Sequence, residues 1–189
     1  MNLVLIGAGG HAKAVCEAIA ASDNVLCAYA DPRPAAWLDI EHFDDESETD
    51  KLDPATGVVI GIGGVTTEAL EARLRILDHF IEAGRPTPAI VHQAACVSPS
   101  AELGPGVIIL AGAVVQPAAK LGRGAIVNTR AVVEHDSAIG AGSHIAPGAM
   151  VLGGCRVGDR AMVGAGAVVL PGSEVPDASL VPALKRYPQ

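Results

Sequence analysis

Aliphatic side chains recur at every sixth position throughout the second half of the chain. Residues 95–184 divide into fifteen blocks of six with no insertion, and the first residue of a block is nearly always small. A period of six is neither the helical period nor the alternation of a simple strand. It predicts a parallel β-helix, in which each block forms one flat side of a triangular coil. The aliphatic residues at the third position of the blocks are Val97, Leu103, Ile109, Val115, Leu121, Val127, Val133, Ile139, Ile145, Val151, Val157, Val163, Val169, Val175 and Val181.

The dimensions of this β-helix follow from the repeat. Three sides complete one turn, so the blocks predict five turns and, with strands stacked about 4.8 Å apart, a prism about 24 Å tall. We expect the aliphatic residue to fill the interior and the small residue to lie where the chain rounds a corner. Half of the residues are hydrophobic but only 3% are aromatic, which fits an interior too narrow for rings. No repeat is evident after residue 184.

The first ninety residues follow a different pattern, in which short apolar runs alternate with helical periodicity. The alternation predicts a small Rossmann-like parallel α/β sheet. We therefore divide the chain into a domain at residues 1–91 and a β-helix domain at residues 92–189. The acidic stretch 41–50 is expected to be a solvated loop or irregular connection. The expected strands are residues 3–6, 25–30, 57–62 and 87–91, and the expected helices are residues 13–21 and 66–83, the second with Leu70, Leu74, Leu77 and Ile81 on one face.

The charge argues against a nucleic-acid-binding protein, and the spacing of the cysteines argues against a cysteine-bound metal. The net charge of −8 argues against nucleic-acid binding, which favours a basic face. Cys16, Cys27, Cys96 and Cys155 lack metal-ligand spacing, so we interpret them as reduced thiols. Neither a basic leader nor an apolar run of about 20 residues is present, and we expect a cytoplasmic protein without a membrane span.

The first expected strand runs into a glycine-rich turn. Residues 7–12 read GAGGHA, which satisfies G-x-G-x-x-G/A between a strand and a helix. Glycines let the backbone approach a phosphate, and the helix N-terminus supplies free N–H groups. The domain contains only one mononucleotide-binding half, which favours a nucleotide over a dinucleotide as the ligand. The alternative is that the residues form a tight turn that binds no ligand. The candidate nucleotide-binding residues are Gly7, Gly9, Gly10, His11, Lys13 and Asp31, the last at the end of the second strand.

A second group of candidate residues lies in the β-helix. His135 occupies the fifth position of its block, near a corner, so its side chain should point outwards. It can accept a proton near neutral pH, and the adjacent Asp136 or Glu134 can hold its tautomer. His144 follows at the second position of a later block. The alternative is that both are ordinary surface residues. A zinc site would need three histidines on the β-helix. Only His135 and His144 lie within it, because His92 precedes it, so we expect no metal.

Together these motifs resemble the sugar acetyltransferases of the bacillosamine and sialic-acid type, which join a small nucleotide-sugar domain to a left-handed β-helix. The resemblance is carried by residues 7–13, Asp31 and residues 128–144. It implies a homotrimer with acetyl-CoA in grooves between neighbouring β-helices. It also implies that His135 is the general base, assisted by Asp136. The residues that it implies for acetyl-CoA are His144, Asn128 and Gly153, the last through a backbone N–H to the thioester oxygen.

The resulting hypothesis is an acetyl-CoA-dependent N-acetyltransferase acting on the amino group of a nucleotide-linked sugar. One alternative is O-acetylation of sialic acid or a related sugar. Another is a non-catalytic nucleotide-binding protein whose β-helix serves only to form a trimer. The C-terminus departs from the family pattern, because residues 179–185 (SLVPALK) come early and lack the glycine of a Gly-Val-Pro-Ala-Lys-like ending. We therefore expect a β-helix one turn short and an altered docking of the CoA nucleotide.

Overall fold

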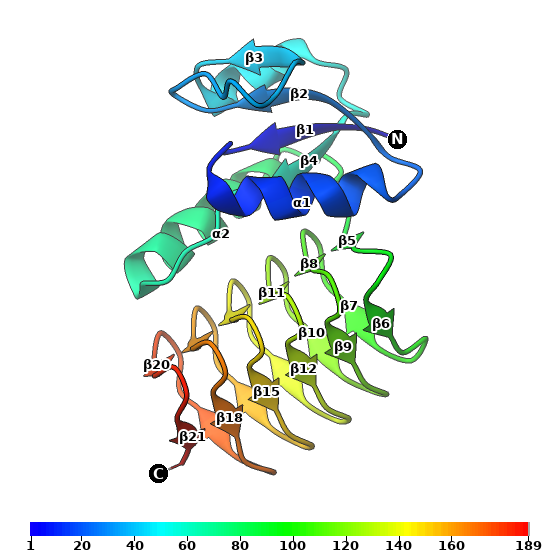
Figure 1. Cartoon of the computed structure of the whole chain (residues 1–189). Helices are drawn as coiled ribbons and strands as arrows, with labels where there is room; N and C mark the ends of the chain where they lie inside the picture. The colour runs from blue at the N-terminus through cyan, green and yellow to red at the C-terminus, as the bar shows by residue number, and fades with distance from the viewer. Residues whose placement is uncertain (189) are drawn as a thin grey trace.

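A computed structural model describes residues 1–188 and has two parts, a small α/β domain above a β-helix (Figure 1). The α/β domain contains a four-stranded parallel sheet in the order β3-β2-β1-β4. Its central strand β1 is a run of aliphatic residues buried on both faces, as expected for a parallel sheet with helices beside it. The strands are β1 (Asn2–Ile6), β2 (Val25–Ala30), β3 (Glu41–Phe43) and β4 (Gly57–Ile60).

Two helices connect these strands to each other and to the β-helix. Helix α1 spans Gly10–Ala20 and therefore begins three residues before the expected start, with Gly9 as its N-cap. Helix α2 spans Thr67–Glu82, and the hydroxyl of Thr66 caps it by accepting the N–H of Ala69 at 3.3 Å. Its buried face includes Leu70, Leu74 and Leu77 as predicted, but it continues through Phe80, while Ile81 is half-buried.

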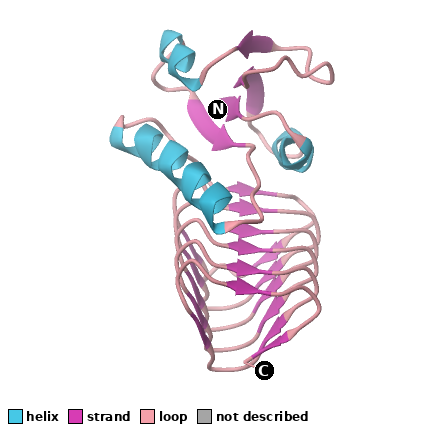
Figure 2. Ribbon diagram, turned by 90° about the vertical axis from the view of Figure 1, so that its left-hand side faces the viewer, coloured by secondary structure: helices cyan, strands magenta, loops and turns pink. Residues whose placement is uncertain are grey.

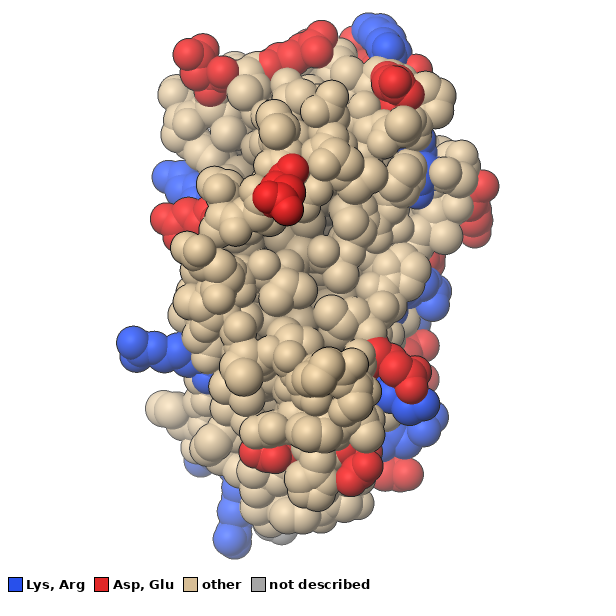
Figure 3. Space-filling view, turned by 90° about the vertical axis from the view of Figure 1, so that its right-hand side faces the viewer, with Lys and Arg blue, Asp and Glu red and all other residues tan. Residues whose placement is uncertain are grey.

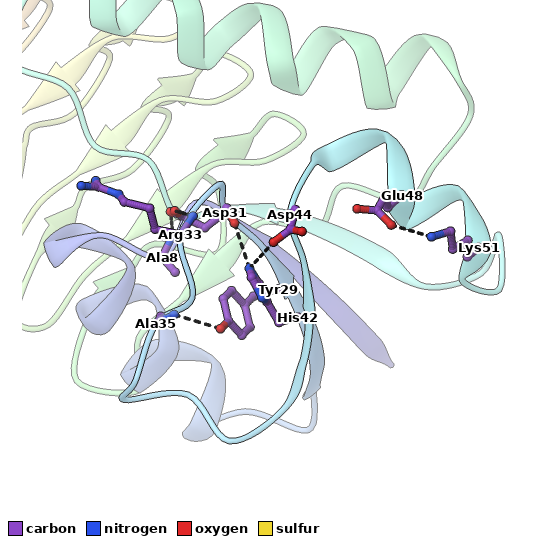
Figure 4. Close-up of polar contacts among 9 residues, drawn as sticks. All are labelled: Ala8, Tyr29, Asp31, Arg33, Ala35, His42, Asp44, Glu48 and Lys51. Carbon is purple, nitrogen blue, oxygen red and sulfur yellow. Dashed lines mark hydrogen bonds and ion pairs between the residues drawn. The ribbon is translucent and has the colours of Figure 1, made fainter.

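The acidic stretch at residues 41–50 is more ordered than its charge suggests, so the expectation of a loop was wrong. It contains edge strand β3 and most of a 3-10 helix, η1 (Glu46–Lys51). Phe43 and Thr49 are buried, and they anchor a segment whose carboxylates are exposed or half-buried. The ion pair between Lys51 and Glu48 lies on this outer side (Figure 4). A short strand with one apolar anchor has too little periodicity to be recognised from sequence.

The expected strand at residues 87–91 does not join the N-terminal sheet. The structure has a shorter strand, β5 (Ile90–Val91), which pairs with the β-helix strand β8 (Ile108–Ile109). Ile90 N–H donates to the carbonyl of Val107, and His92 N–H donates to that of Ile109, both at 2.8 Å. This strand therefore forms the first side of the β-helix.

The left-handed β-helix consists of two-residue parallel strands stacked in three sheets (Figure 2). One sheet holds β5, β8, β11 (Ile126–Val127), β14 (His144–Ile145), β17 (Met162–Val163) and β20 (Leu180–Val181). The second holds β6 (Cys96–Val97), β9 (Val114–Val115), β12 (Val132–Val133), β15 (Met150–Val151), β18 (Val168–Val169) and β21 (Arg186–Tyr187). The third holds β7 (Glu102–Leu103), β10 (Lys120–Leu121), β13 (Ala138–Ile139), β16 (Arg156–Val157) and β19 (Glu174–Val175).

The predicted interior is confirmed, and it extends beyond the predicted blocks. The third-position aliphatic residues form one core with the small first-position residues. Val91 precedes the first predicted block by one repeat and packs against this core. The repeat also continues past residue 184, contrary to expectation, because β21 pairs with β18 and Tyr187 packs against the core. This last side was not recognised in the sequence because its third position holds an aromatic residue, Tyr187, instead of an aliphatic one.

The outward side chains give the three sheets different characters. The sheet of β5 and β8 is the covered face, because Ile108, Leu110 and Ile126 are buried against α1 and the N-terminal sheet. The sheet of β7 is the charged face, where Lys120 pairs with Glu102 at 3.0 Å. The sheet of β6 is the apolar face, whose second-position side chains from β6 to β18 are Cys96, Val114, Val132, Met150 and Val168.

Helix α2 fixes the position of the N-terminal domain over the β-helix. Near its start, the hydroxyl of Thr67 donates to the carbonyl of Ala178 at 3.1 Å. Near its end, Asp78 accepts from Arg123 at 2.6 Å and 3.0 Å in a two-pronged ion pair. The helix therefore lies across several coils rather than touching only the first.

Candidate active site

The glycine turn between β1 and α1 leaves space and free donors for an anion. Gly9 and Gly10 have no atom within 4 Å of the place where a Cβ would lie, and neither has a positive φ. Gly7 differs, because its φ is +86° and a Cβ would lie 2.5 Å from Ile62 Cγ1. The first-turn N–H groups of α1 have no intrahelical acceptors, and no side chain among residues 1–188 caps them. Gly7 shapes the turn, whereas Gly9 and Gly10 leave the helix N-terminus open to a phosphate.

The carboxylate of Asp31 holds two loops together beside this turn (Figure 4). One oxygen accepts the N–H of Ala8 and the other accepts the N–H of Arg33, each at 2.9 Å. The hydrogen bond from Ala8 is the main cause that lowers the pKa of Asp31. Asp31 therefore orients the glycine turn, and its remaining lone pairs can still accept from a ligand.

His11 and Lys13 leave the first turn of α1 in different directions. His11 faces the β-helix, where its ring centroid lies 6.3 Å from that of His144. Burial is the main cause that lowers the pKa of His11 to about 4, and its Nε2 has no hydrogen-bond partner in residues 1–188. Lys13 points away, with Nζ 5.5 Å from the centre of the Trp37 ring. The structure therefore separates two residues that the sequence analysis assigned to one site.

His144 and Asn128 are linked by hydrogen bonds on the covered face. The side-chain oxygen of Asn128 accepts the N–H of Thr129 at 2.7 Å, which directs its amide nitrogen to His144 Nε2 at 2.9 Å. His144 Nδ1 lies 2.8 Å from the carbonyl of Gly64 and acts as the donor there. Burial lowers the pKa of His144 to about 4. The imidazole is therefore neutral, with its proton on Nδ1.

A cavity of about 580 Å³ opens beside these residues. His11, Asn128 and His144 are its polar lining residues, and the loop of Gly63, Gly64 and Val65 forms part of the wall. The remaining lining is mostly small or apolar and belongs to later coils of the covered face: Ala146, Pro147, Met162, Gly164, Ala165, Leu180 and Ala183. The volume falls within the range of about 300–1,000 Å³ typical of small-molecule sites.

His135 lies in a different environment, exposed at a corner of the β-helix. Its Nδ1 is 2.8 Å from Oδ2 of Asp136, and this hydrogen bond is the main cause that raises the pKa of His135. A Cβ on Gly153, one coil further, would lie 2.8 Å from the His135 ring, so the ring needs a glycine there. The amide of Gly153 donates to no acceptor in residues 1–188. An imidazole with a carboxylate partner thus lies close to Gly153, whose N–H has no acceptor in residues 1–188.

The two histidines do not meet within one chain. His135 follows β12 at the corner between the apolar and charged faces, whereas His144 lies in β14 on the covered face. His135 is also absent from the lining of the 580 Å³ cavity. Of these two histidines, only His135 has an acidic partner, since His144 contacts Asn128 and the carbonyl of Gly64.

Arg73 is a buried residue at this junction that the sequence analysis did not identify. It lies on the buried face of α2, and its Nη2 donates to the carbonyl of Gly142. Burial lowers its pKa to about 10, and its positive charge helps to lower the pKa of both His11 and His144. The sequence did contain a signal for it, because an arginine on the apolar face of a predicted helix indicates a buried charge.

Metal-binding clusters and membrane-spanning helices are both absent from residues 1–188. No group of three or more His, Cys, Asp or Glu side chains is arranged to hold a metal ion. No helix in this part of the chain has the length and apolar character needed to cross a membrane.

Family models match both halves of the chain. The model of the PglD N-terminal domain matches residues 2–71, and the model of bacterial transferase hexapeptide repeats matches residues 136–171. A comparison with curated protein sequences found no match.

Solved structures resemble the chain over nearly its whole length. The acetyltransferase domain of PglB from Neisseria gonorrhoeae FA1090, in complex with acetyl coenzyme A, is 32% identical with a TM-score of 0.86, covering 96% of this chain and 88% of that one. PerB from Caulobacter crescentus, in complex with CoA and GDP-perosamine, is also 32% identical with a TM-score of 0.86, covering 97% and 86%. A histidine-to-alanine variant of GDP-perosamine N-acetyltransferase from that organism is 27% identical, with a TM-score of 0.74 and coverage of 97% and 94%.

Identity above 30% over almost the full length, on a shared two-domain fold, establishes common family membership. The chain is therefore an acyltransferase of the sugar acetyltransferase family in which a PglD-type N-terminal domain precedes a hexapeptide-repeat β-helix.

Proposed function

We propose that this protein transfers the acetyl group of acetyl-CoA to the amino group of a nucleotide-linked amino sugar. The observation that carries the proposal is the exposed His135–Asp136 pair, whose imidazole lies close to Gly153, a residue whose amide has no acceptor in residues 1–188. Relatives support the substrates, since the PglB domain binds acetyl coenzyme A and PerB binds CoA and GDP-perosamine.

The two substrates are assigned to different parts of the molecule. The open turn at Gly9 and Gly10 supplies N–H donors for the diphosphate of a nucleotide sugar. The mostly apolar cavity on the covered face suits the pantetheine arm of acetyl-CoA, and His144 and Asn128 supply polar groups in its lining. Both nitrogens of His144 are engaged within the chain, so we assign it a shaping and contact role rather than proton transfer.

The chemical step follows from the orientation of His135. Because Nδ1 donates to Asp136, Nε2 carries the free lone pair and can accept a proton from the sugar amine as its nitrogen attacks the thioester carbon. The carbonyl oxygen gains negative charge, and the Gly153 amide is the nearby donor that can stabilise it. Collapse forms the amide bond and breaks the carbon–sulfur bond, and the CoA thiolate leaves and takes up a proton.

A homotrimer is the assembly that we propose, because one chain does not bring His135 to the cavity. The apolar face has Met150 39% exposed and valines above and below it, in contrast to the charged face. Figure 3 shows a side of the molecule whose centre is covered mainly by uncharged atoms. Packing three such faces around an axis would bury these side chains and place His135 of one chain near a cavity of its neighbour.

The decisive test is release of CoA thiol, measured with a thiol-reactive dye, in the presence of acetyl-CoA and GDP-, UDP- or CMP-linked amino sugars. N-acetylation gives a product stable to mild alkali, whereas the sialic-acid-type O-acetylation alternative gives a labile ester. Absence of thiol release with every acceptor would instead favour a non-catalytic assembly protein. All four cysteines are free, which supports a reducing compartment, and we propose the cytoplasm.

A further inference from the structure

A second open cavity lies on the outer side of α1, away from the β-helix. Its volume is about 380 Å³, and it is lined by Lys13, Cys16, Glu17, Ala20 and Trp37. The first four residues are spaced i, i+3, i+4 and i+7, so they form one face of the helix. Trp37 comes from the loop after β2 and is 38% exposed. We call this cavity the Trp37 shelf.

The loop that carries Trp37 is held by a network of its own (Figure 4). The N–H of Ala35 donates to the hydroxyl of Tyr29 at 2.9 Å, and the Tyr29 ring stacks on His42 with centroids 4.7 Å apart. His42 Nε2 lies 2.9 Å from the carbonyl of Asp31. The loop is therefore fixed two residues before Trp37, and the indole is presented at a defined place.

Lys13 lines the shelf and also belongs to the first turns of α1, next to the anion site at the helix start. Lys13 follows the N-cap Gly9 by one helical turn, and its ammonium lies over the Trp37 ring at 5.5 Å. A diphosphate at the glycine turn would reach Lys13, and the attached nucleoside would extend towards the indole. Asp31 already accepts two backbone N–H groups, so the shelf offers the more open set of groups for a base.

The chemistry of the shelf distinguishes between bases. Glu17 is exposed, makes no ion pair in residues 1–188, and is the only carboxylate in the lining. Burial raises the pKa of Cys16 to about 11, so its thiol stays protonated and adds weakly polar surface. A carboxylate only accepts hydrogen bonds, and guanine presents two adjacent donors, the ring N1–H and the N2 amino group. Adenine presents no such pair, and uracil places its one N–H between two carbonyl oxygens that a carboxylate repels.

We propose that the Trp37 shelf binds the base of the nucleotide sugar and selects guanine, with the base stacked on Trp37 and its N1–H and N2 amino groups donating to Glu17. The proposal rests on the proposed function for the presence of a nucleotide sugar. It adds the identity of the base and two specificity-determining residues.

Trp37 is the only tryptophan of the chain, so its fluorescence reports directly on the shelf. Titration of the full-length protein with GDP should quench this fluorescence in a saturable manner, and UDP and ADP should bind at least tenfold more weakly. Glu17→Gln should weaken GDP binding about tenfold and remove the preference over UDP, because the amide presents a donor as well as an acceptor. Glu71→Gln, which changes an exposed acid of α2, is the matched control and should leave both unchanged.

Activity separates failure of the shelf from failure of the proposed function. In the acetyl-transfer assay, Trp37→Ala and Glu17→Gln should raise KM for a GDP-linked amino sugar about tenfold and leave KM for acetyl-CoA unchanged. If acetyl transfer is insensitive to both substitutions, or faster with the UDP-linked sugar, the proposed guanine binding at the Trp37 shelf is wrong, and the proposed function still holds. GDP quenching without any acetyl transfer overturns the function and leaves a guanine-nucleotide site. Circular dichroism of each variant confirms that it is folded.

Discussion

The Nδ1 atom of His135 lies 2.8 Å from Oδ2 of Asp136, whereas His144 directs the same ring atom to a backbone carbonyl. This difference assigns the two histidines to opposite protonation behaviour, since the pKa of His135 is raised and that of His144 is lowered to about 4. A base that works near neutral pH needs the first environment and not the second.

Replacing the proposed base should abolish most of the activity. His135→Ala is expected to lower kcat by about 10² to 10⁴, the usual contribution of a general base. The side chain is exposed, so folding and oligomeric state should be unchanged, as checked by light scattering. Near wild-type turnover in a folded variant would remove His135 from the mechanism.

The acidic limb of the pH profile should depend on Asp136. Because His135 must be unprotonated to act, kcat/KM rises as the pH passes upward through its raised pKa. Asp136→Asn removes the main cause of that rise, so the limb should move to lower pH and kcat should fall. Asn tolerates the left-handed backbone found at this position, where φ is +60°. Glu134→Gln serves as the control and should move the limb less, since Glu134 acts only through its more distant charge.

The apolar face should control assembly. The wild-type particle is expected to have about three times the 19.1 kDa chain mass. Val132→Asp, on the apolar face, should produce monomers and lower turnover at least tenfold. Ala138→Asp occupies the same block position on the charged face and should leave the trimer intact. A strictly monomeric protein with full turnover would contradict a site shared between chains.

Substitutions at the glycine turn should weaken binding of the nucleotide sugar and leave binding of acetyl-CoA unchanged. Gly9→Val places a side chain in the open space at the helix N-terminus, and Asp31→Ala releases the N–H groups of Ala8 and Arg33. Each should raise KM for the nucleotide sugar several-fold, with little change in KM for acetyl-CoA. Saturation curves for both substrates measure this directly. Loss of acetyl-CoA affinity with sugar affinity retained would reverse the two assignments.

The buried histidines should make the protein sensitive to acid. The folded-state pKa of His11 and His144 is about 4 against 6.5 when unfolded, so the unfolded chain binds more protons between these values. Their contribution to stability is therefore complete above pH 6.5 and is lost as the pH falls towards 4. His144→Asn retains an N–H donor for Gly64 without the titration, and its melting temperature should fall less between pH 7.5 and 5. Equal falls in variant and wild type would contradict this origin.

Local pattern was sufficient to predict the β-helix and the glycine turn. Each block of six is one side of a coil whose inward residue is surrounded by identical positions one coil away, so the period alone predicts the interior. Likewise, the glycine turn needs only a strand, a helix and the residues between them. The same reasoning failed where the periodic signal was weak, at β3, and where an aromatic replaced an aliphatic, at Tyr187.

Tertiary structure decided everything that depends on how the two domains meet. The pairing of β5, the buried charge of Arg73 and the carbonyl of Gly64 opposite His144 all involve residues far apart in the sequence. Sequence analysis identified His11 and His144 separately, but only their burial at one junction makes them neutral. The physical reason is that a side chain's hydration and charge environment come from its neighbours in space, whereas a repeat or a turn is determined by neighbours along the chain.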